Sequence, residues 1–122
     1  MLPFTGPDRS GAGRMEQAGN WQELSRAIVR LLRDEYGIAE CRLTRDALLD
    51  RDLGLNGEQL EGLLATIEER CRLRFPDGTL DEVLRLEDLA LLASWLRGFY
   101  KRPGFLSEAC AARARALNPS AV

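Results

Sequence analysis

The sequence contains no histidine, and it has only three cysteines among 122 residues. Histidine is the commonest general base near neutral pH and a frequent metal ligand, so its absence removes the usual starting point for both kinds of site. The cysteines are odd in number and widely spaced, which fits neither a disulfide framework nor a zinc-ligand pattern. We expect Cys41, Cys71 and Cys110 to be small buried residues, we expect no metal, and we predict that the chain is not an enzyme.

Long apolar runs are also missing from the sequence. No stretch approaches the roughly 20 apolar residues that a membrane helix requires, and residues 1–20 lack the apolar core of a secretory signal. We therefore expect no membrane association and a cytoplasmic location. The net charge of −2 argues against general nucleic-acid binding. Residues 50–72 are nevertheless acidic and residues 97–122 basic, which suggests selection of a protein partner.

Strand patterns and internal repeats are absent, whereas helical periodicity is present. Apolar residues recur at three- and four-residue steps in segments that begin near residues 21, 56 and 86, and a short helix is expected between Pro103 and Pro119. The connection over 38–55 is long, and its leucines must pack against the core. These leucines are Leu43, Leu48, Leu49 and Leu53. The sequence thus predicts an all-α protein.

The chain divides into three predicted parts. Residues 1–19 are rich in glycine and proline and are expected to form a flexible N-terminal arm. Residues 20–102 form the predicted helical domain. Residues 103–122 form a predicted C-terminal helical extension.

The stretch DLGLNGEQLEGLL, residues 52–64, contains a well-defined helix start. Asn56 is a strong N-cap residue, and Gln59 stands where the reciprocal partner of a capping box is expected. A hairpin turn at Asn56-Gly57 is the competing interpretation, but the flanking residues have helical and not alternating periodicity. The predicted buried stripe of this helix consists of Leu60, Leu63, Leu64, Ile67 and Cys71.

Several motifs follow one another without a gap between residues 52 and 89. An Asp-Leu-Gly motif precedes the leucine- and glutamate-rich helix, a Phe-Pro-Asp break follows it, and Leu-Glu-Asp-Leu opens the last helix of the series. In this order the sequence resembles the acyl carrier protein family, and the likeness extends over about residues 21–100. The resemblance implies a four-helix bundle with a long first loop and a short third helix, to which the C-terminal helix would be an addition.

In that family, a serine at the start of the second helix carries 4′-phosphopantetheine. The free N–H groups and the positive end of the helix dipole suit a phosphodiester there. In this sequence Gly57 takes the position of the serine, between Asn56 and Glu58. Glycine has no oxygen that could carry the group, so the attachment position is degenerate and we expect no cofactor.

Three functional hypotheses follow. The favoured one is a non-catalytic acyl carrier protein-like module that lacks phosphopantetheine and binds a protein, such as a synthase or acyltransferase of lipid, fatty-acid or polyketide-type metabolism. The alternatives are a true acyl carrier with an atypical attachment and an unrelated small helical adaptor or regulatory protein. The resemblance places partner binding on the acidic face of the second helix, and a solvated helix face is the competing interpretation. The candidate residues are Glu58, Glu61, Glu68 and Glu69.

The helix expected over residues 86–100 is apolar on two sides. Its main stripe is Leu89, Leu92, Ala93, Leu96 and Tyr100, and its second stripe is Leu91, Trp95 and Phe99. The second stripe must be covered or must form an exposed patch. We expect the tail to cover it with Phe105, Leu106, Ala109, Cys110 and Leu117, leaving Arg113 and Arg115 in solvent. The alternative is a partner or homodimer contact through Leu91, Trp95 and Phe99.

Overall fold

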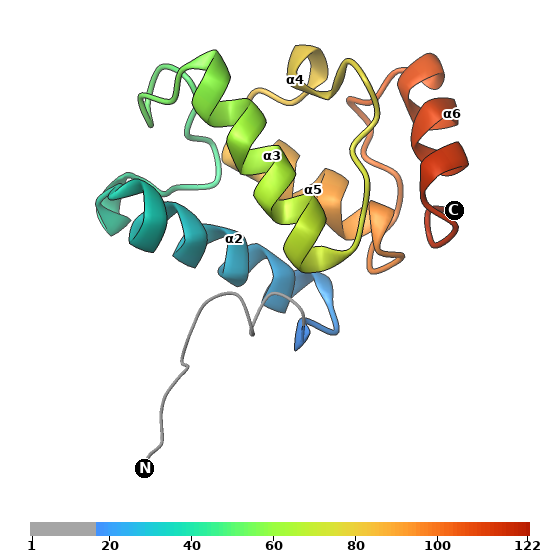
Figure 1. The fold of residues 1–122 in the computed structure, drawn as a ribbon, viewed down its shortest axis with the longest axis horizontal. Coiled ribbons are helices and arrows are strands. Elements are labelled where there is room, and N and C mark those ends of the chain that lie inside the picture. Colours follow the sequence, from blue (N-terminus) through green and yellow to red (C-terminus); the bar gives the residue numbers. More distant parts are fainter. Residues whose placement is uncertain (1–16) are drawn as a thin grey trace.

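The computed structural model describes residues 17–122. Within this range the chain is helical and contains no β-strand, so the predicted all-α class is confirmed (Figure 1). The elements are α2 (Trp21–Tyr36), the 3-10 helix η1 (Glu40–Arg42), α3 (Gly57–Cys71), α4 (Thr79–Glu82), α5 (Leu86–Leu96) and α6 (Glu108–Leu117).

The end of the predicted N-terminal arm is packed against the helices. Residues 1–16 of the arm lie outside the described residues, but Ala18 is only 5% exposed and belongs to the core cluster. The backbone N–H of Gly19 donates to Glu23 Oε1 at 2.8 Å, and the Asn20 side chain accepts from the Glu23 N–H at 2.9 Å. The chain is therefore fixed before α2 begins.

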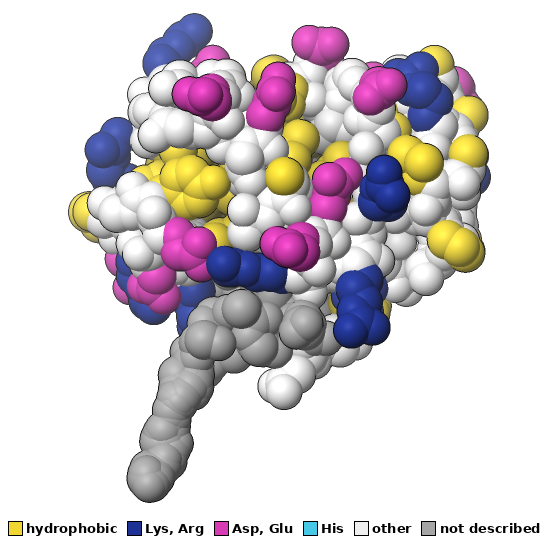
Figure 2. Space-filling view, in the orientation of Figure 1, with side chains coloured by type: hydrophobic (Ala, Val, Ile, Leu, Met, Phe, Trp, Pro, Cys, Tyr) yellow, Lys and Arg dark blue, Asp and Glu magenta, His cyan; other side chains and the backbone are white. Residues whose placement is uncertain are grey.

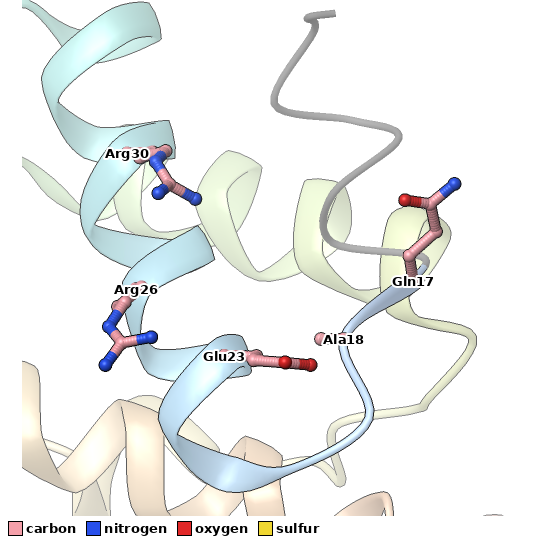
Figure 3. A pocket seen from close by; sticks show the side chains of 5 residues that line it. All are labelled: Gln17, Ala18, Glu23, Arg26 and Arg30. Atoms are coloured by element: carbon pink, nitrogen blue, oxygen red, sulfur yellow. The ribbon is translucent and has the colours of Figure 1, made fainter.

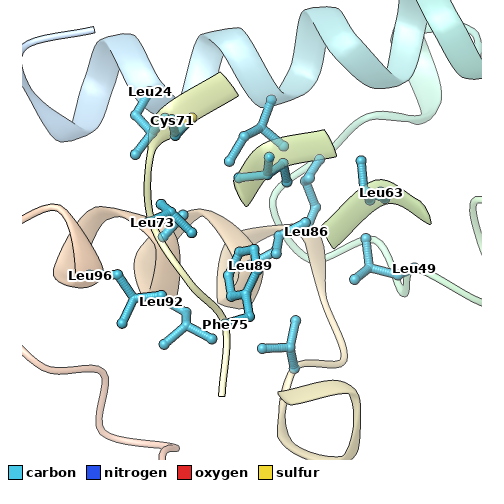
Figure 4. Close-up of a cluster of buried hydrophobic side chains, with 14 of the residues drawn as sticks. Leu24, Leu49, Leu63, Cys71, Leu73, Phe75, Leu86, Leu89, Leu92 and Leu96 are labelled. Carbon is cyan, nitrogen blue, oxygen red and sulfur yellow. The ribbon is translucent and has the colours of Figure 1, made fainter. Parts of the chain in front are cut away.

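Helices α2, α3 and α5 supply most of the core. Side chains from all three meet in one buried cluster, together with Leu73 and Phe75 from the connection that follows α3 (Figure 4). α2 lies directly against α5. In α3 the predicted stripe is buried at Leu63, Ile67 and Cys71 and half-buried at its two other leucines, as the helical period requires.

The long connection between α2 and α3 is packed, as predicted. Leu49 and Leu53 are buried, and Leu43 and Leu48 are half-buried. Its backbone also satisfies the start of α5, because carbonyl oxygens of the connection accept hydrogen bonds from the N–H groups of Leu86 (3.0 Å) and Glu87 (2.9 Å). N–H groups in the first turn of a helix have no partner within that helix, so this contact stabilises both segments.

α5 ends earlier than the sequence suggests. The helix stops at Leu96, whereas we expected it to run to residue 100. Gly98 adopts a left-handed backbone conformation with φ 78°, and a Cβ atom there would lie 2.9 Å from the carbonyl oxygen of Ser120. Ser120 of the tail therefore lies close to Gly98, just beyond the end of α5. Tyr100 lies beyond the break and is 38% exposed, so its predicted place in the core stripe is wrong.

The predicted C-terminal helix is present as α6, but a different face of it is buried. Its buried residues are Cys110, Ala111 and Ala114, preceded by the buried Leu106. The predicted cover was wrong at Phe105, Ala109 and Leu117, which are all exposed. Small alanine side chains let two backbones approach closely. Our prediction relied on the larger apolar side chains, and it therefore selected the wrong face of this helix.

The interpretation of Leu91, Trp95 and Phe99 as one exposed contact surface is also wrong. Trp95 is completely buried, with the guanidinium carbon of Arg115 5.6 Å from the centre of its ring. Leu91 instead lines an apolar hollow against α2. These side chains therefore face different neighbours and cannot form a single homodimer contact.

The cysteines divide between surface and core. Cys71 and Cys110 are buried, as expected, whereas Cys41 on η1 is exposed, so the prediction for Cys41 was wrong. Burial raises the pKa of the Cys110 thiol, and the nearby Glu82 carboxylate acts in the same direction. A neutral thiol is a poor nucleophile, so the environment of Cys110 favours packing over chemistry.

Candidate functional site

The start of α3 has the predicted capping box. Asn56 Oδ1 accepts from the Gln59 N–H at 2.8 Å, and Gln59 Oε1 accepts from the Asn56 N–H at 2.9 Å. The helical interpretation of Asn56-Gly57 is confirmed, and the hairpin is excluded. The protein's own side chains therefore use two of the donors near this helix start.

Gly57 is the first residue of α3 and lies in open space. It is exposed, its φ is not positive, and a Cβ atom built on it would meet no atom within 4 Å. Neither packing nor backbone conformation requires glycine here, and a serine would fit. What Gly57 lacks is the hydroxyl oxygen. Glu58, the next residue, is exposed and adds a negative charge at the same helix end.

Two other hydroxyl groups lie at helix starts, at residues that were not predicted to be site residues. Ser107 is the N-cap of α6, and Thr79 opens α4. The Ser107 hydroxyl donates to Glu82 Oε2 at 2.7 Å and accepts from the Cys110 N–H at 3.2 Å. Thr79 is buried, and its hydroxyl donates to the Pro76 carbonyl at 2.6 Å. The serine before a helical run after Pro103 was the signal that could have identified Ser107.

The acidic residues of α3 are not equivalent. Glu58, Glu61 and Glu69 are exposed, whereas Glu68 is half-buried and its Oε2 accepts from the Phe75 N–H at 2.7 Å. Glu68 therefore helps to fix the connection after α3. Arg70, on the same helix, pairs with Glu35 of α2 at 2.6 Å.

A groove lies between α3 and the chain that leads into α4. Its α3 side is formed by Glu61, Leu64, Ala65 and Glu68, and its other side by residues 75–81. We call it the acidic groove, because Asp77 and Asp81 join the two glutamates and none of the described residues that line it is lysine or arginine. Figure 2 shows acidic side chains over the region of α3 and α4, with apolar side chains between them. In the structure, Glu61 and Glu68 thus line the same groove as two aspartates that were not among the predicted site residues.

A second hollow beside the start of α2 is explained by the helix cap. It is lined by Gln17, Ala18, Glu23, Arg26 and Arg30 (Figure 3). Glu23 already accepts from the Gly19 N–H, which holds the chain on one side of the hollow. We assign no ligand to it.

A third hollow, between α2 and α5, is apolar. Trp21, Val29 and Leu91 are among its lining residues. Arg45 and Glu87, which also line it, form an ion pair at 2.8 Å. The rings of Trp21 and Tyr100 lie 5.5 Å apart, centre to centre.

Two kinds of functional feature, a metal-binding cluster and a membrane-spanning helix, are absent from the described residues. Within residues 17–122, no three cysteine or carboxylate side chains are grouped so that they could hold a metal ion. No helix in that range has both the length and the apolar character of a membrane span. Comparison of the sequence with models of known protein families gives no match, and comparison with curated proteins gives none either.

Proposed function

We propose that residues 21–100 form an acyl carrier protein-like unit that lacks phosphopantetheine and binds a protein partner through the acidic groove. The order of elements supports this likeness: a long helix, a long packed connection, a second long helix, a four-residue helix and a further helix. In this proposal α6 is an addition to a four-helix unit made of α2, α3, α4 and α5.

The loss of carrier chemistry is supported by the start of α3. A phosphodiester needs a hydroxyl oxygen, and Gly57 offers none although the space around it is open. The neighbouring Glu58 would also repel a phosphate. The module would then act by binding and not by catalysis.

The acidic groove is the observation that carries the partner proposal. Four carboxylates line it without a basic residue among its described lining residues, and the half-buried Leu64 and Leu80 add apolar surface to it. Such a surface complements a partner that presents basic side chains around an apolar centre. Charges of this kind mainly set the association rate and exclude wrong partners. A synthase or acyltransferase of lipid, fatty-acid or polyketide-type metabolism is the partner class that the likeness suggests.

Ser107 gives the alternative, a true carrier with an atypical attachment, a defined position. It is an exposed residue with its hydroxyl at the N-terminus of a ten-residue helix. Against this alternative, the hydroxyl is hydrogen-bonded to the Glu82 carboxylate, which would repel a phosphate.

An intact-mass measurement tests the cofactor proposal. We expect incubation with coenzyme A and a broad-specificity phosphopantetheinyl transferase to leave the mass of the wild-type chain unchanged. The variant Gly57→Ser should fold like the wild type and tests whether the hydroxyl alone restores a substrate. Modification of the wild-type chain would overturn the proposal, and mapping the modified peptide would show whether Ser107 is the acceptor.

Charge reversal tests the partner proposal. Cross-linking in extracts of the source cells should identify a partner that is lost with Glu61→Lys or Asp81→Lys. Both residues line the groove without making the hydrogen bond of Glu68. Glu40→Lys, an exposed acid on η1, is the control and should keep the partner. A partner retained by both groove variants but lost with Lys101→Glu would favour an adaptor that binds through its basic tail.

A further inference from the structure

The outer wall of the acidic groove has little regular structure of its own. Residues 73–78 lie outside any helix, and α4 has only four residues. So short a helix is not stable by itself in water. On the α3 side, the wall is held by the hydrogen bond from the Phe75 N–H to Glu68. Burial of Phe75 and Thr79 anchors parts of the segment 74–82, and the tail adds further contacts to it.

Asn118 holds the beginning of this segment. It is 3% exposed, its Oδ1 accepts from the Arg74 N–H at 2.8 Å, and its Nδ2 donates to the Arg74 carbonyl at 2.7 Å. The side-chain amide thus pairs with both polar groups of one residue, as a neighbouring β-strand would. Nδ2 also donates to the Ala114 carbonyl at 2.8 Å, which ties Asn118 to α6.

Two further contacts hold the middle and the end of the segment. The Arg113 guanidinium donates to the Asp77 carbonyl from Nε (3.3 Å) and Nη2 (3.0 Å). The backbone N–H and the hydroxyl of Ser107 both donate to the Glu82 carboxylate at 2.7 Å. A carboxylate at the N-terminus of a helix is also favoured by the helix dipole.

The three contacts follow one another in reverse order along the two segments. Positions 107, 113 and 118 of the tail meet positions 82, 77 and 74 of the wall. α6 therefore runs antiparallel to the wall and holds it at both ends and near the middle. We infer that the segment from Ser107 to Asn118 is a clasp that fixes the outer wall of the acidic groove.

The consequence for binding rests on the proposed function. With the clasp in place, the groove is preformed and a partner does not have to order its wall, which favours affinity. Release of the clasp would remove its contacts with Arg74, Asp77 and Glu82 and would thereby loosen the wall. The tail would then regulate the groove without forming part of it.

Hydrogen exchange on the unliganded chain tests the clasp. Arg113→Gln and Arg115→Gln are matched variants on the same helix, since both remove one positive charge but only Arg113 contacts the wall. We expect Arg113→Gln to speed exchange of amides between residues 73 and 83 by about two- to fivefold, and Asn118→Ala by about tenfold. Arg115→Gln should leave exchange in this segment within about twofold of the wild type.

The position of the amides that exchange faster in the variants decides whether the clasp is correct. Faster exchange confined to residues 73–83 supports the clasp. Unchanged exchange there in Arg113→Gln, or a change that is equal in α2 and in the wall, would overturn it. A synthetic amphipathic helix with a lysine-rich face serves as the probe of the groove, and its affinity should fall with Arg113→Gln more than with Arg115→Gln. Peptide binding that is insensitive to Glu61→Lys would count against the proposed function while leaving the exchange result standing.

Discussion

Gly62 lies in the middle of α3, where its lack of a side chain has no structural explanation within the fold. The residue is exposed, and a Cβ atom built on it would come no closer than 3.8 Å to the Tyr36 hydroxyl. Alanine is favoured over glycine inside a helix by about 1 kcal/mol. We expect Gly62→Ala to raise the free energy of unfolding by about 0.5–1 kcal/mol in urea titrations. A loss of stability would mean that α3 packs more tightly at this point than the geometry indicates.

Asn56 is the residue on which the start of α3 depends most. Its side chain accepts from the Gln59 N–H, and its own N–H is satisfied by Gln59 in return. Replacing such a cap with alanine costs about 1 kcal/mol, whereas serine can still accept the hydrogen bond. Asn56→Ala should therefore lower the free energy of unfolding by about that amount. Asn56→Ser should keep the free energy of unfolding close to the wild-type value. Equal values for the two variants in chemical denaturation would contradict this role.

Between elements, the contact of α4 with α6 should make stability depend on acid pH. The N–H and the hydroxyl of Ser107 donate to Glu82 and lower the pKa of that carboxyl below its usual value. A carboxyl whose pKa is lowered by folding stabilises the protein above the unfolded value of about 4.3. The contribution is lost as the pH falls through the lower folded pKa. We expect Tm to decrease from pH 5 towards pH 3 partly for this reason.

Thermal unfolding of Glu82→Gln followed by circular dichroism between pH 3 and pH 7 checks this expectation. The variant should have a lower Tm at pH 7 and a flatter acid limb than the wild type. Glu61→Gln removes an exposed carboxylate beyond the first turn of α3 and controls for the change of one charge. An acid limb of unchanged slope in Glu82→Gln would show that other carboxylates dominate.

How far the elements could be predicted depends on whether their causes are local. α2 and the start of α3 follow from apolar periodicity, from Asn20 and Asn56 as caps and from Gly37 as a stop, all of which are readable in the sequence. The early end of α5 also has a local cause, since left-handed Gly98 is followed by a hydrogen bond from the Phe99 N–H to the Ser94 carbonyl at 2.8 Å, but we did not use Gly98 as a stop. The buried face of α6, in contrast, depends on which residues it meets in the folded chain.

The residues of the candidate site also differ in whether the sequence alone could identify them. Gly57 and the glutamates of α3 could be selected from the sequence, because they belong to one helix. Asp77 and Asp81 could not, because their place in the groove depends on how residues 73–81 fold back along α3. The role of Glu68 also stayed hidden, since its hydrogen-bond partner is a backbone N–H that only the tertiary structure brings near.

For the molecule as a whole, the tail should be required for a closed core. Trp95 is completely buried, and Arg115 of α6 lies over its ring. In a Trp21→Phe background, Trp95 is the one remaining tryptophan, and we expect acrylamide to quench it weakly. A chain that ends at residue 102 should be readily quenched and should lose at least about 2 kcal/mol of stability, since burial of Leu106 alone contributes about that much. Weak quenching in the shortened chain would show that Trp95 is protected without the tail.

The three cysteines differ in burial, so the reactivity of their thiols reports which part of the protein has opened. Cys41 is exposed on η1, Cys110 faces inward from α6, and Cys71 is buried at the end of α3. An alkylating reagent should modify Cys41 at once, Cys110 when α6 lifts away, and Cys71 only when the helices around it separate. Simultaneous modification of Cys110 and Cys71 would instead mean that the tail and the bundle open as one unit. The order in which the wild-type thiols react thus gives the order in which the parts of the protein open, without an introduced label.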